Sequence, residues 1–448
     1  MASAVRAITS WKGGAWVVRR SLTGVAVGLA VFWGMVNLIQ AMTWLLQPLV
    51  FKKDFFNIYV LGKAFGAGGD PYMPMNALAK RFIGSTGGIR IFTHPTPHPP
   101  TMGLIAMPFG ALAYQVSAAL WFCLSLAALM VSLHLLQKWA GLRPWSGILA
   151  VLPFVVLAYP PVGQDLSLGQ PTMFLLLLLT GALVSLRRGH EGRAGLLVGI
   201  SLLIKQLAWP LVLLFLVRRQ WRAFWASSAT IVFGYALAVL RTGPGTLWRY
   251  LTTVLPNVGA IYRSSTFNTS PFSIPYVRVL ARNIGSVTFP SGPPTPQQTA
   301  IGGVLCLTLL VASLLAIINR PDTEAAYCVM IAVSTVINPI SWQFYQVLIL
   351  IPAFYVFGWL RDRGYPWRES AAAAVVALAL YQPYYQWEKF AFWAAGRVPP
   401  SDGGRSLASL DYLPGLITLG LLYSVVALIM LLAWLNRRPD LPQARVSA

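Results

Sequence analysis

The stretch AGLLVGISLLIKQLAWPLVLLFLV, residues 194–217, decides how the chain is threaded through a membrane. Arginine clusters flank its 24 apolar-rich residues, at 187–193 on one side and at 218–222 on the other. Because Lys and Arg in short loops stay in the cytoplasm, one continuous span would turn the second cluster and the later arginines outward. Two half-length helices, each of about 12 residues and so about 18 Å long, keep both clusters inside. The pattern therefore favours a hairpin.

Lys205 lies at the apex of this expected hairpin, within LLIKQLAWP. Irregular backbone at membrane depth is tolerated where it lines a water-filled cavity. A lysine inside a membrane is costly and is usually paired with another group. The alternative is a lysine that snorkels from one continuous helix. We favour the interpretation in which Lys205 belongs to a functional site that opens to the outside.

The composition is typical of a polytopic membrane protein, with 56% hydrophobic and 10% charged residues. The net charge of +22 arises from 34 Lys and Arg against 12 Asp and Glu. These cations form short clusters between apolar runs, so we interpret them as topology signals and as contacts with anionic membrane lipids. We expect no nucleic-acid partner. The three cysteines all lie in apolar runs, which indicates core positions.

We expect an all-α, polytopic protein with one membrane domain over residues 1–448 and about twelve transmembrane or half-membrane helices. Beside the hairpin, the apolar runs predict spans near 22–46, 115–136, 145–160, 171–186, 223–240, 300–318, 324–338, 345–360, 369–386 and 412–435. Both termini are then cytoplasmic. The external segments are 47–114, 241–299 and 387–411, and the turns near 161–170 and 338–346 also face out.

Asp54 is the external acid with the clearest functional position, in LVFKKDFFNIYV, residues 49–60. It follows the first long apolar run directly, beside Lys52 and Lys53. The alternative roles for this acid are a helix cap or an ion pair with one of these lysines. Asp70, in GAGGDPYMP, is instead typical of a turn.

An ordered set of motifs resembles family 87 of the membrane glycosyltransferases, which have the GT-C architecture. The motifs are DFFNIYVLGKAFGAGGDPY (54–72), HPPTMGLIAMPFGAL (98–112), LSLGQPTMFLLLLL (166–179), the arginine-flanked stretch 194–223, NTSPFSI (268–274) and NPISWQFYQVLILIP (338–352). The resemblance implies external loops that carry short helices. It also implies transfer of a sugar, with mannose the best guess, from a polyprenyl-phosphate donor to a lipid or glycan acceptor. The resemblance further implies that the reaction takes place on the outer face of the bacterial cytoplasmic membrane. GT-C enzymes use an acid in the first external loop as catalytic base, and Asp54 matches that position.

The implied chemistry needs one base, because an inverting transfer removes a proton from the acceptor hydroxyl while a phosphate leaves without protonation. Cations can stabilise the charge on the leaving phosphate. Lys205 and Arg263 are candidates for this role, so we expect neither a metal nor another cofactor. His98, in HPTPHPP, and Gln170, in SLGQPT, are candidates for binding the donor. An exposed loop histidine and a polar group at a helix start are the alternatives for these two residues.

Candidates for binding the acceptor or the sugar lie in the last two motifs. Asn268 lies in the second external segment, where a turn residue is the alternative. Trp342 and Tyr345 can stack on a sugar, although aromatic anchoring at the membrane interface is the commoner role. Gln343 stands where the family usually has a histidine after the Ser-Trp pair, so it retains hydrogen bonding but not a positive charge.

Transport is the competing class of function, since many spans, a broken hairpin and an intramembrane lysine also suit a transporter or flippase of a lipid-linked sugar. A membrane-embedded glycan ligase or polymerase that uses a diphosphate donor is a third possibility. The sequence contains no inverted or parallel repeat, and its external segments are long and asymmetric. These features favour an enzyme over a transporter.

Overall fold

A computed structural model describes residues 2–46, 54–84, 93–145, 147–263, 265, 268–276, 294–320, 322–382, 417 and 419–437. Only the backbone is described for residues 2–23 and 147–148. The predicted external segment 387–411 lies outside the described residues, as do Lys52 and Lys53.

The regular secondary structure of the described ranges is helical, and no β-strand occurs in them. Its helices are α1 (Ala2–Leu46), α2 (Asp54–Gly66), α3 (Met75–Ile83), α4 (Pro100–Ala111), α5 (Tyr114–Trp139), α6 (Leu152–Leu157), α7 (Pro160–Leu168), α8 (Thr172–Arg187), α9 (Glu191–Ile204), α10 (Pro210–Val217), α11 (Trp221–Thr242), α12 (Pro244–Arg249), α13 (Leu255–Tyr262), α15 (Pro296–Ile317), α16 (Thr323–Ser334), α17 (Leu350–Asp362), α18 (Trp367–Tyr381) and α21 (Gly420–Leu435). Short 3-10 segments are η1 (Gly147–Val151), η3 (Pro271–Tyr276) and η4 (Gln343–Ile349), and η2 (Tyr250–Val254) is a π-helix. The predicted all-α class is confirmed for this part of the chain.

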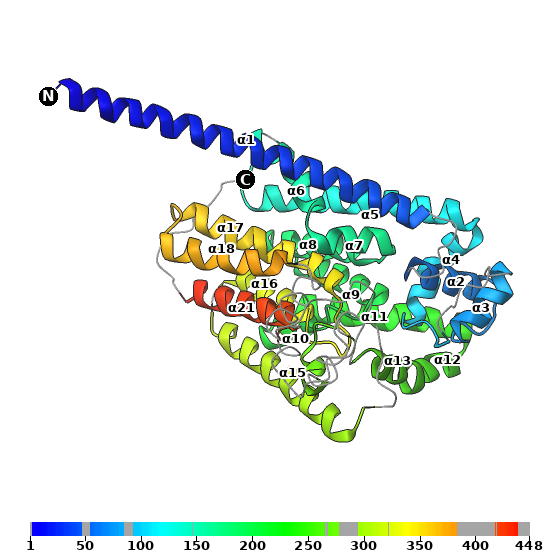
Figure 1. Cartoon of the computed structure of the whole chain (residues 1–448). Helices are drawn as coiled ribbons and strands as arrows, with labels where there is room; N and C mark the ends of the chain where they lie inside the picture. The colour runs from blue at the N-terminus through cyan, green and yellow to red at the C-terminus, as the bar shows by residue number, and fades with distance from the viewer. Residues whose placement is uncertain are drawn as a thin grey trace, which may run out of the picture.

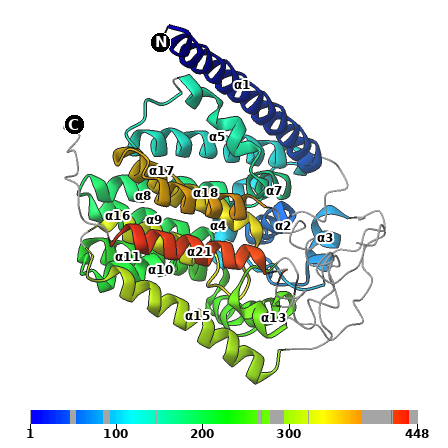
Figure 2. The same ribbon diagram turned by 60° about the vertical axis from the view of Figure 1, so that its left-hand side comes forward.

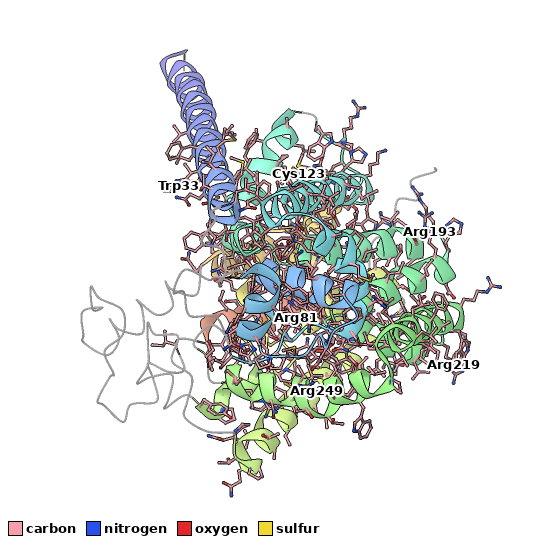
Figure 3. The ribbon with its side chains drawn as sticks, turned by 90° about the vertical axis from the view of Figure 1, so that its right-hand side faces the viewer. Trp33, Arg81, Cys123, Arg193, Arg219 and Arg249 are labelled. Atoms are coloured by element: carbon pink, nitrogen blue, oxygen red, sulfur yellow. The ribbon has the colours of Figure 1, made fainter. Side chains whose placement is uncertain are left out.

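The long helices form a bundle in which α2, α3, α4, α12 and α13 gather at one end (Figure 1). We call this end the α2 end. Turning the molecule keeps α2, α3 and α13 together at that end, and α1 runs along the outside of the bundle (Figure 2). Figure 3 views the α2 end directly, with Arg81 and Arg249 on it. Arg249 Nη1 donates to Asp70 Oδ2 at 2.6 Å, while Asp70 Oδ1 accepts from the Tyr72 N–H, so Asp70 is the turn residue that the sequence predicted.

The opposite end of the bundle collects arginines from helix ends far apart in sequence, and we call it the arginine end. Arg193 and Arg222 line one shallow hollow there. Arg187 donates to the Trp139 carbonyl, and Arg218 donates to the carbonyl of Arg320 at 2.9 Å. The clusters that the positive-inside pattern assigned to one side therefore do share one end. Whether that end and the termini face the cytoplasm remains a prediction.

The predicted hairpin in residues 194–217 is confirmed by the packing of α9 against α11. Gly195 packs on Ala223, and further along Leu203 packs on Gly234, so the two helices run in the same direction. Cβ atoms at Gly195 and Gly234 would overlap these neighbours, which explains the glycines at this close crossing. Two consecutive parallel helices require a return between them, and α10 supplies it.

The structure supports a multi-pass membrane protein but does not confirm about twelve spans. Within the described ranges, five helical stretches are long and apolar enough to cross a membrane: Gly24–Leu46, Tyr114–Trp139, Trp221–Thr242, Pro296–Ile317 and Gln343–Asp362. The bent pair Leu149–Leu157 and Pro160–Leu168, with 64° between its parts, would make a sixth. Other apolar helices, α8, α16 and α21, have 10–17 residues. They are too short for a full straight crossing of about 30 Å.

Two predicted boundaries were wrong. The span expected at 145–160 does not end in an external turn, because residues 160–168 form α7. Pro160 and Pro161 lack an N–H and so end one helix, yet proline also suits the first turn of the next. The turn expected near 338–346 contains the beginning of η4. Of the cysteines, Cys306 and Cys328 are buried, but Cys123 on α5 is exposed (Figure 3).

Candidate active site

Asp54 is the first residue of α2, the helix at the start of the predicted first external segment. The Phe55 side chain next to it is fully buried, with its ring centroid 5.3 Å from that of Trp121 and 5.8 Å from that of Tyr114. This aromatic packing fixes the start of α2 against α5. Asp54 itself is half-buried at the boundary of the packed core.

Gln170 reaches Asp54 because the chain turns sharply after α7. Gly169 ends α7 in the left-handed conformation, with φ of 64°. A Cβ at this position would lie 2.6 Å from Phe55 Cβ, so the close approach of the turn to α2 requires glycine. Gln170 follows, and its side-chain Nε2 donates a hydrogen bond to Asp54 Oδ2. Two residues predicted to belong to the site, Asp54 and Gln170, are thereby brought together.

Lys205, at the hairpin apex, is the third member of a hydrogen-bonded chain. We call this chain of Asp54, Gln170 and Lys205 the relay. Lys205 follows the last turn of α9 in an extended conformation, with φ of −157° and ψ of 130°. Its ammonium Nζ donates to Gln170 Oε1 at 2.9 Å and lies 4.3 Å from the centroid of the Tyr345 ring. The Gln170 amide therefore joins Lys205 to Asp54, with its donor facing the carboxylate and its acceptor facing the ammonium. The two candidates that spacing alone could not relate lie in one cluster.

Two opposing effects act on the pKa of Asp54 in this cluster. Burial raises the pKa of Asp54 above its usual range, while the hydrogen bond from Gln170 and the positive charge of Lys205 lower it. A carboxylate in such surroundings can accept a proton and is more basic than an exposed aspartate. The relay limits the upward shift of the pKa and so favours the ionised form.

His98 is 3% exposed and lies close enough to Lys205 to experience its charge. Burial, together with that charge, lowers the pKa of His98 to about 3. Tyr72 Oη donates to the His98 backbone carbonyl at 3.0 Å and anchors the loop. The exposed-loop alternative is wrong for this residue. His98 is a neutral imidazole at physiological pH and can offer one N–H, but no positive charge, to a substrate.

Tyr262 and His94 form a second polar contact near Asp54 that the sequence did not single out. His94 Nε2 lies 2.7 Å from Tyr262 Oη, while His94 Nδ1 faces the Pro95 carbonyl at 2.8 Å. Burial and the negative charge of Asp54 raise the pKa of Tyr262, so the phenol stays protonated. The Trp342 ring packs edge-on against Tyr262, with 5.3 Å between centroids. This contact explains the half-buried position of Trp342.

Asp165 is a second buried acid within electrostatic reach of Lys205. It lies on α7 against Thr172, and its backbone carbonyl accepts the Gln170 N–H at 3.0 Å. The sequence placed it in an external turn, where an acid needs no explanation. Its position four residues before Gly169, directly before the motif 166–179 that contains Gln170, is the signal that could have identified it.

Asn268 has a structural role in this conformation. Its Nδ2 donates to the Pro339 carbonyl at 2.9 Å, and its Oδ1 accepts from the N–H groups of Ser270 at 3.1 Å and Ser341 at 2.8 Å. An isolated β-bridge also joins Asn268 to Trp342. The side chain is 1% exposed. It ties the fifth motif to the sixth, and sugar binding is not needed to explain it.

The observed contacts of Arg263 do not place its side chain at the relay. Its Nη1 donates to Thr299 Oγ1 at 2.9 Å, and its guanidinium lies 5.0 Å from the Phe272 ring centroid. Gln343 is 3% exposed, and neither atom of its amide has a hydrogen-bond partner in the described part of the chain. Tyr345 lies within the Lys205 cluster, as described above.

Within the described ranges, no three His, Cys, Asp or Glu side chains come together as a possible metal site. The expected independence of metal and other cofactors stays a prediction.

Comparison with known proteins identifies the class of this membrane protein first. Glycosyltransferase family 87 matches residues 96–341, which is more than half of the 448-residue chain. The chain therefore belongs to that family, and its long apolar helices agree with a multi-pass membrane protein. The matched range includes His98, Gln170 and Lys205 but excludes Asp54, Trp342, Gln343 and Tyr345.

Particular relatives are curated as Alpha-(1->3)-arabinofuranosyltransferase. The protein from Mycobacterium tuberculosis is 30% identical over 174 residues, which are 37% of this chain and 40% of the relative. The protein from Corynebacterium glutamicum is 25% identical over 225 residues, or 49% and 52% of the two chains. The matches thus span about half, or less, of the length of these relatives. No solved structure matches the chain.

These comparisons confirm the predicted family and favour a glycosyltransferase over a transporter. They do not support mannose as the transferred sugar, because the names of the relatives specify an arabinofuranosyl group.

Proposed function

We propose that this protein transfers a glycosyl group from a polyprenyl-phosphate donor to a hydroxyl group of a lipid or glycan acceptor, with inversion and with Asp54 as general base. One observation carries the proposal: the Gln170 amide separates the Asp54 carboxylate from the Lys205 ammonium. Both charges are thus available in one place without neutralising each other directly. This is the pairing that base-assisted attack and departure of a phosphate require.

In the proposed step, the acceptor hydroxyl attacks the anomeric carbon of the donor while Asp54 accepts its proton. A bond forms between the acceptor oxygen and the anomeric carbon. The bond between that carbon and the phosphate oxygen breaks, and its electron pair stays on the lipid phosphate. Lys205 stabilises this developing charge. No proton has to reach the leaving group, so a single carboxylate suffices.

The surrounding residues suit binding of the two substrates. His98 is buried beside Lys205 and, as a neutral imidazole, can donate to the donor phosphate or sugar. Trp342 and Tyr345 offer aromatic faces to a sugar. The proposal does not depend on Arg263 or Asn268, whose polar groups bind Thr299 and backbone atoms of neighbouring loops.

The membrane placement extends the same proposal. We infer that the arginine end and both termini are cytoplasmic and that the α2 end faces the outside of a bacterial cytoplasmic membrane. The collection of arginines at one end supports this orientation through the positive-inside bias. A single domain over residues 1–448 is supported by one buried apolar cluster that extends from Ala41 to Leu435.

The transferred sugar is proposed from the relatives. Their names favour an arabinofuranosyl group over the mannosyl group that the resemblance suggested. The reaction class does not depend on this choice, since both sugars can leave from a polyprenyl phosphate at the anomeric carbon.

The test supplies the full-length protein in proteoliposomes with radiolabelled polyprenyl-phosphate arabinofuranose or polyprenyl-phosphate mannose. Lipids and glycans extracted from a strain that lacks the protein serve as acceptors. We expect label to move from the arabinofuranosyl donor to an acceptor. Transfer from the mannosyl donor alone would correct the sugar and retain the reaction. Failure of both donors to label any acceptor would contradict the proposal.

A further inference from the structure

Gln343 and Gln346 on η4 are two buried carboxamides. They are 3% and 0% exposed. Within the part of the chain that the structure describes, neither the Nε2 nor the Oε1 atom of either residue has a partner. A buried polar group that leaves water without a new hydrogen bond costs free energy of folding. Two neighbouring amides in this state therefore require an explanation.

The two amides lie on the same side of their helix. η4 is a 3-10 helix, in which residues three apart are eclipsed. Gln343 and Gln346 are three apart, so their side chains leave η4 in similar directions. Tyr345 lies between them in sequence, 4.3 Å from the Lys205 ammonium and within electrostatic reach of Asp54 and Asp165. η4 therefore passes the proposed active site at Tyr345.

Two other glutamines in the same region, Gln206 and Gln170, have hydrogen-bond partners for both amide atoms. Gln206, next to Lys205, donates through Nε2 to Tyr235 Oη and accepts through Oε1 from Tyr250 Oη at 3.1 Å. Gln170 uses both amide atoms in the relay. The fold can evidently satisfy a buried amide at this end of the bundle.

We propose that Gln343 and Gln346 bind two neighbouring hydroxyl groups of a sugar ring, on either the donor or the acceptor. This inference rests on the proposed glycosyl transfer and adds the groups that recognise the sugar. Each amide offers two N–H donors and an acceptor oxygen, and each hydroxyl can both donate and accept. A vicinal diol therefore satisfies both amides together. η4 carries this recognition beside the reacting groups.

The test replaces each amide by an apolar side chain of similar length, as Gln346→Met and Gln343→Met, in the full-length protein in proteoliposomes. Without substrate, both variants should have a raised thermal midpoint, because the cost of burying an unpartnered amide is removed. The KM for the sugar substrate that the pair recognises should rise about 10-fold in each variant. The KM for the other substrate should stay unchanged, which identifies the source of the hydroxyl groups.

Gln206→Met is the matched control for stability. It should lower the thermal midpoint, because the hydroxyl groups of Tyr235 and Tyr250 each lose the hydrogen bond to Gln206. A substrate analogue that lacks the recognised hydroxyl should bind wild type about 10-fold more weakly and lose little further affinity in the variant. This coupling is not expected of an amide that only supports the fold.

Two outcomes would overturn the proposal. One is a raised thermal midpoint with both KM values unchanged, and the other is a lowered midpoint with unchanged KM values. Asp54→Asn, assayed in parallel, separates failure of this inference from failure of the proposed function. If Asp54→Asn retains wild-type transfer, the proposed base is wrong; if it loses transfer while Gln346→Met and Gln343→Met leave both KM values unchanged, only the amide subsite is wrong.

Discussion

Opposite charges meet in different ways at the two ends of the bundle. At the arginine end, Arg187 binds Glu324 through two nitrogens, one of them 2.5 Å from Glu324 Oε2, and its guanidinium lies 4.6 Å from the Trp139 ring centroid. Trp139 Nε1 also donates to Glu324 Oε1, at 3.2 Å. At the α2 end, Lys205 and Asp54 are joined through the neutral amide of Gln170.

This difference in charge pairing indicates what each end can do. The pair at the arginine end satisfies both charges and joins α5, α8 and α16, so a ligand would gain little by entering it. At the α2 end the ammonium has three donors and the carboxylate about four acceptor sites, and the relay uses one of each. The first arrangement holds helices together, whereas the second retains capacity for a substrate.

Neutralising one acid at each end separates these roles and should give the largest effect. Asp54→Asn should lower kcat by about 10³-fold, the usual contribution of a general base, while donor binding is retained. Glu324→Gln should leave kcat near wild type and lower the free energy of unfolding by about 1 kcal/mol, because this ion pair is partly exposed. Transfer rates and thermal unfolding in proteoliposomes measure both effects. Equal loss of kcat in the two variants would contradict the distinction.

Replacing the cations gives the second comparison. Lys205→Met should lower kcat by about 10²-fold, because the charge of the leaving phosphate loses a positioned cation. Arg187→Met should change kcat less than about twofold, since that charge serves only packing. Initial rates at saturating donor are the measurement. If Arg187→Met proved the more damaging of the two, the arginine end rather than the α2 end would contain the reacting groups.

Two left-handed glycines test whether the backbone holds the relay. Gly189, with φ of 74°, has no described heavy atom within 4 Å of the place that a Cβ would occupy, so Gly189→Ala should cost only the conformational strain of about 1 kcal/mol. Gly169→Ala adds the clash with Phe55 and should cost about 3 kcal/mol. It should also lower kcat, because Gln170 moves away from Asp54. Unfolding midpoints and transfer rates measure the pair, and equal costs would show that the contact with Phe55 can relax.

The hairpin and the choice of Asp54 as a candidate base both depend on order along the chain; the structure confirms the hairpin, and the role of Asp54 stays a prediction. Arginine clusters at 187–193 and 218–222 fix the return between α9 and α11, and Asp54 follows the first apolar run directly. The number of spans could not be predicted equally well. Helices such as α8 and α16 have apolar sequences but stop short of a full crossing, and hydropathy alone does not fix where a packed helix ends.

Contacts between residues distant in sequence could not be predicted. The sequence makes Asn268 a candidate for binding the acceptor or the sugar, and in the structure its amide binds backbone groups near residue 340, some 70 positions away. Only the folded structure shows that Asp165 and Tyr262 lie in the cluster around Asp54 and Lys205. The unpartnered amide of Gln346 is likewise a property of its surroundings.

The pH dependence of kcat/KM in wild type and Gln170→Leu tests the relay at Asp54 most directly. A base works when deprotonated, so activity should fall as pH decreases through the pKa of Asp54. Burial raises that pKa, and the Gln170 hydrogen bond lowers it. Losing this bond should therefore raise the pKa and move the acid limb of the profile to higher pH in Gln170→Leu. An acid limb at the same pH in both proteins, or one that persists in Asp54→Asn, would contradict the assignment of Asp54 as the base.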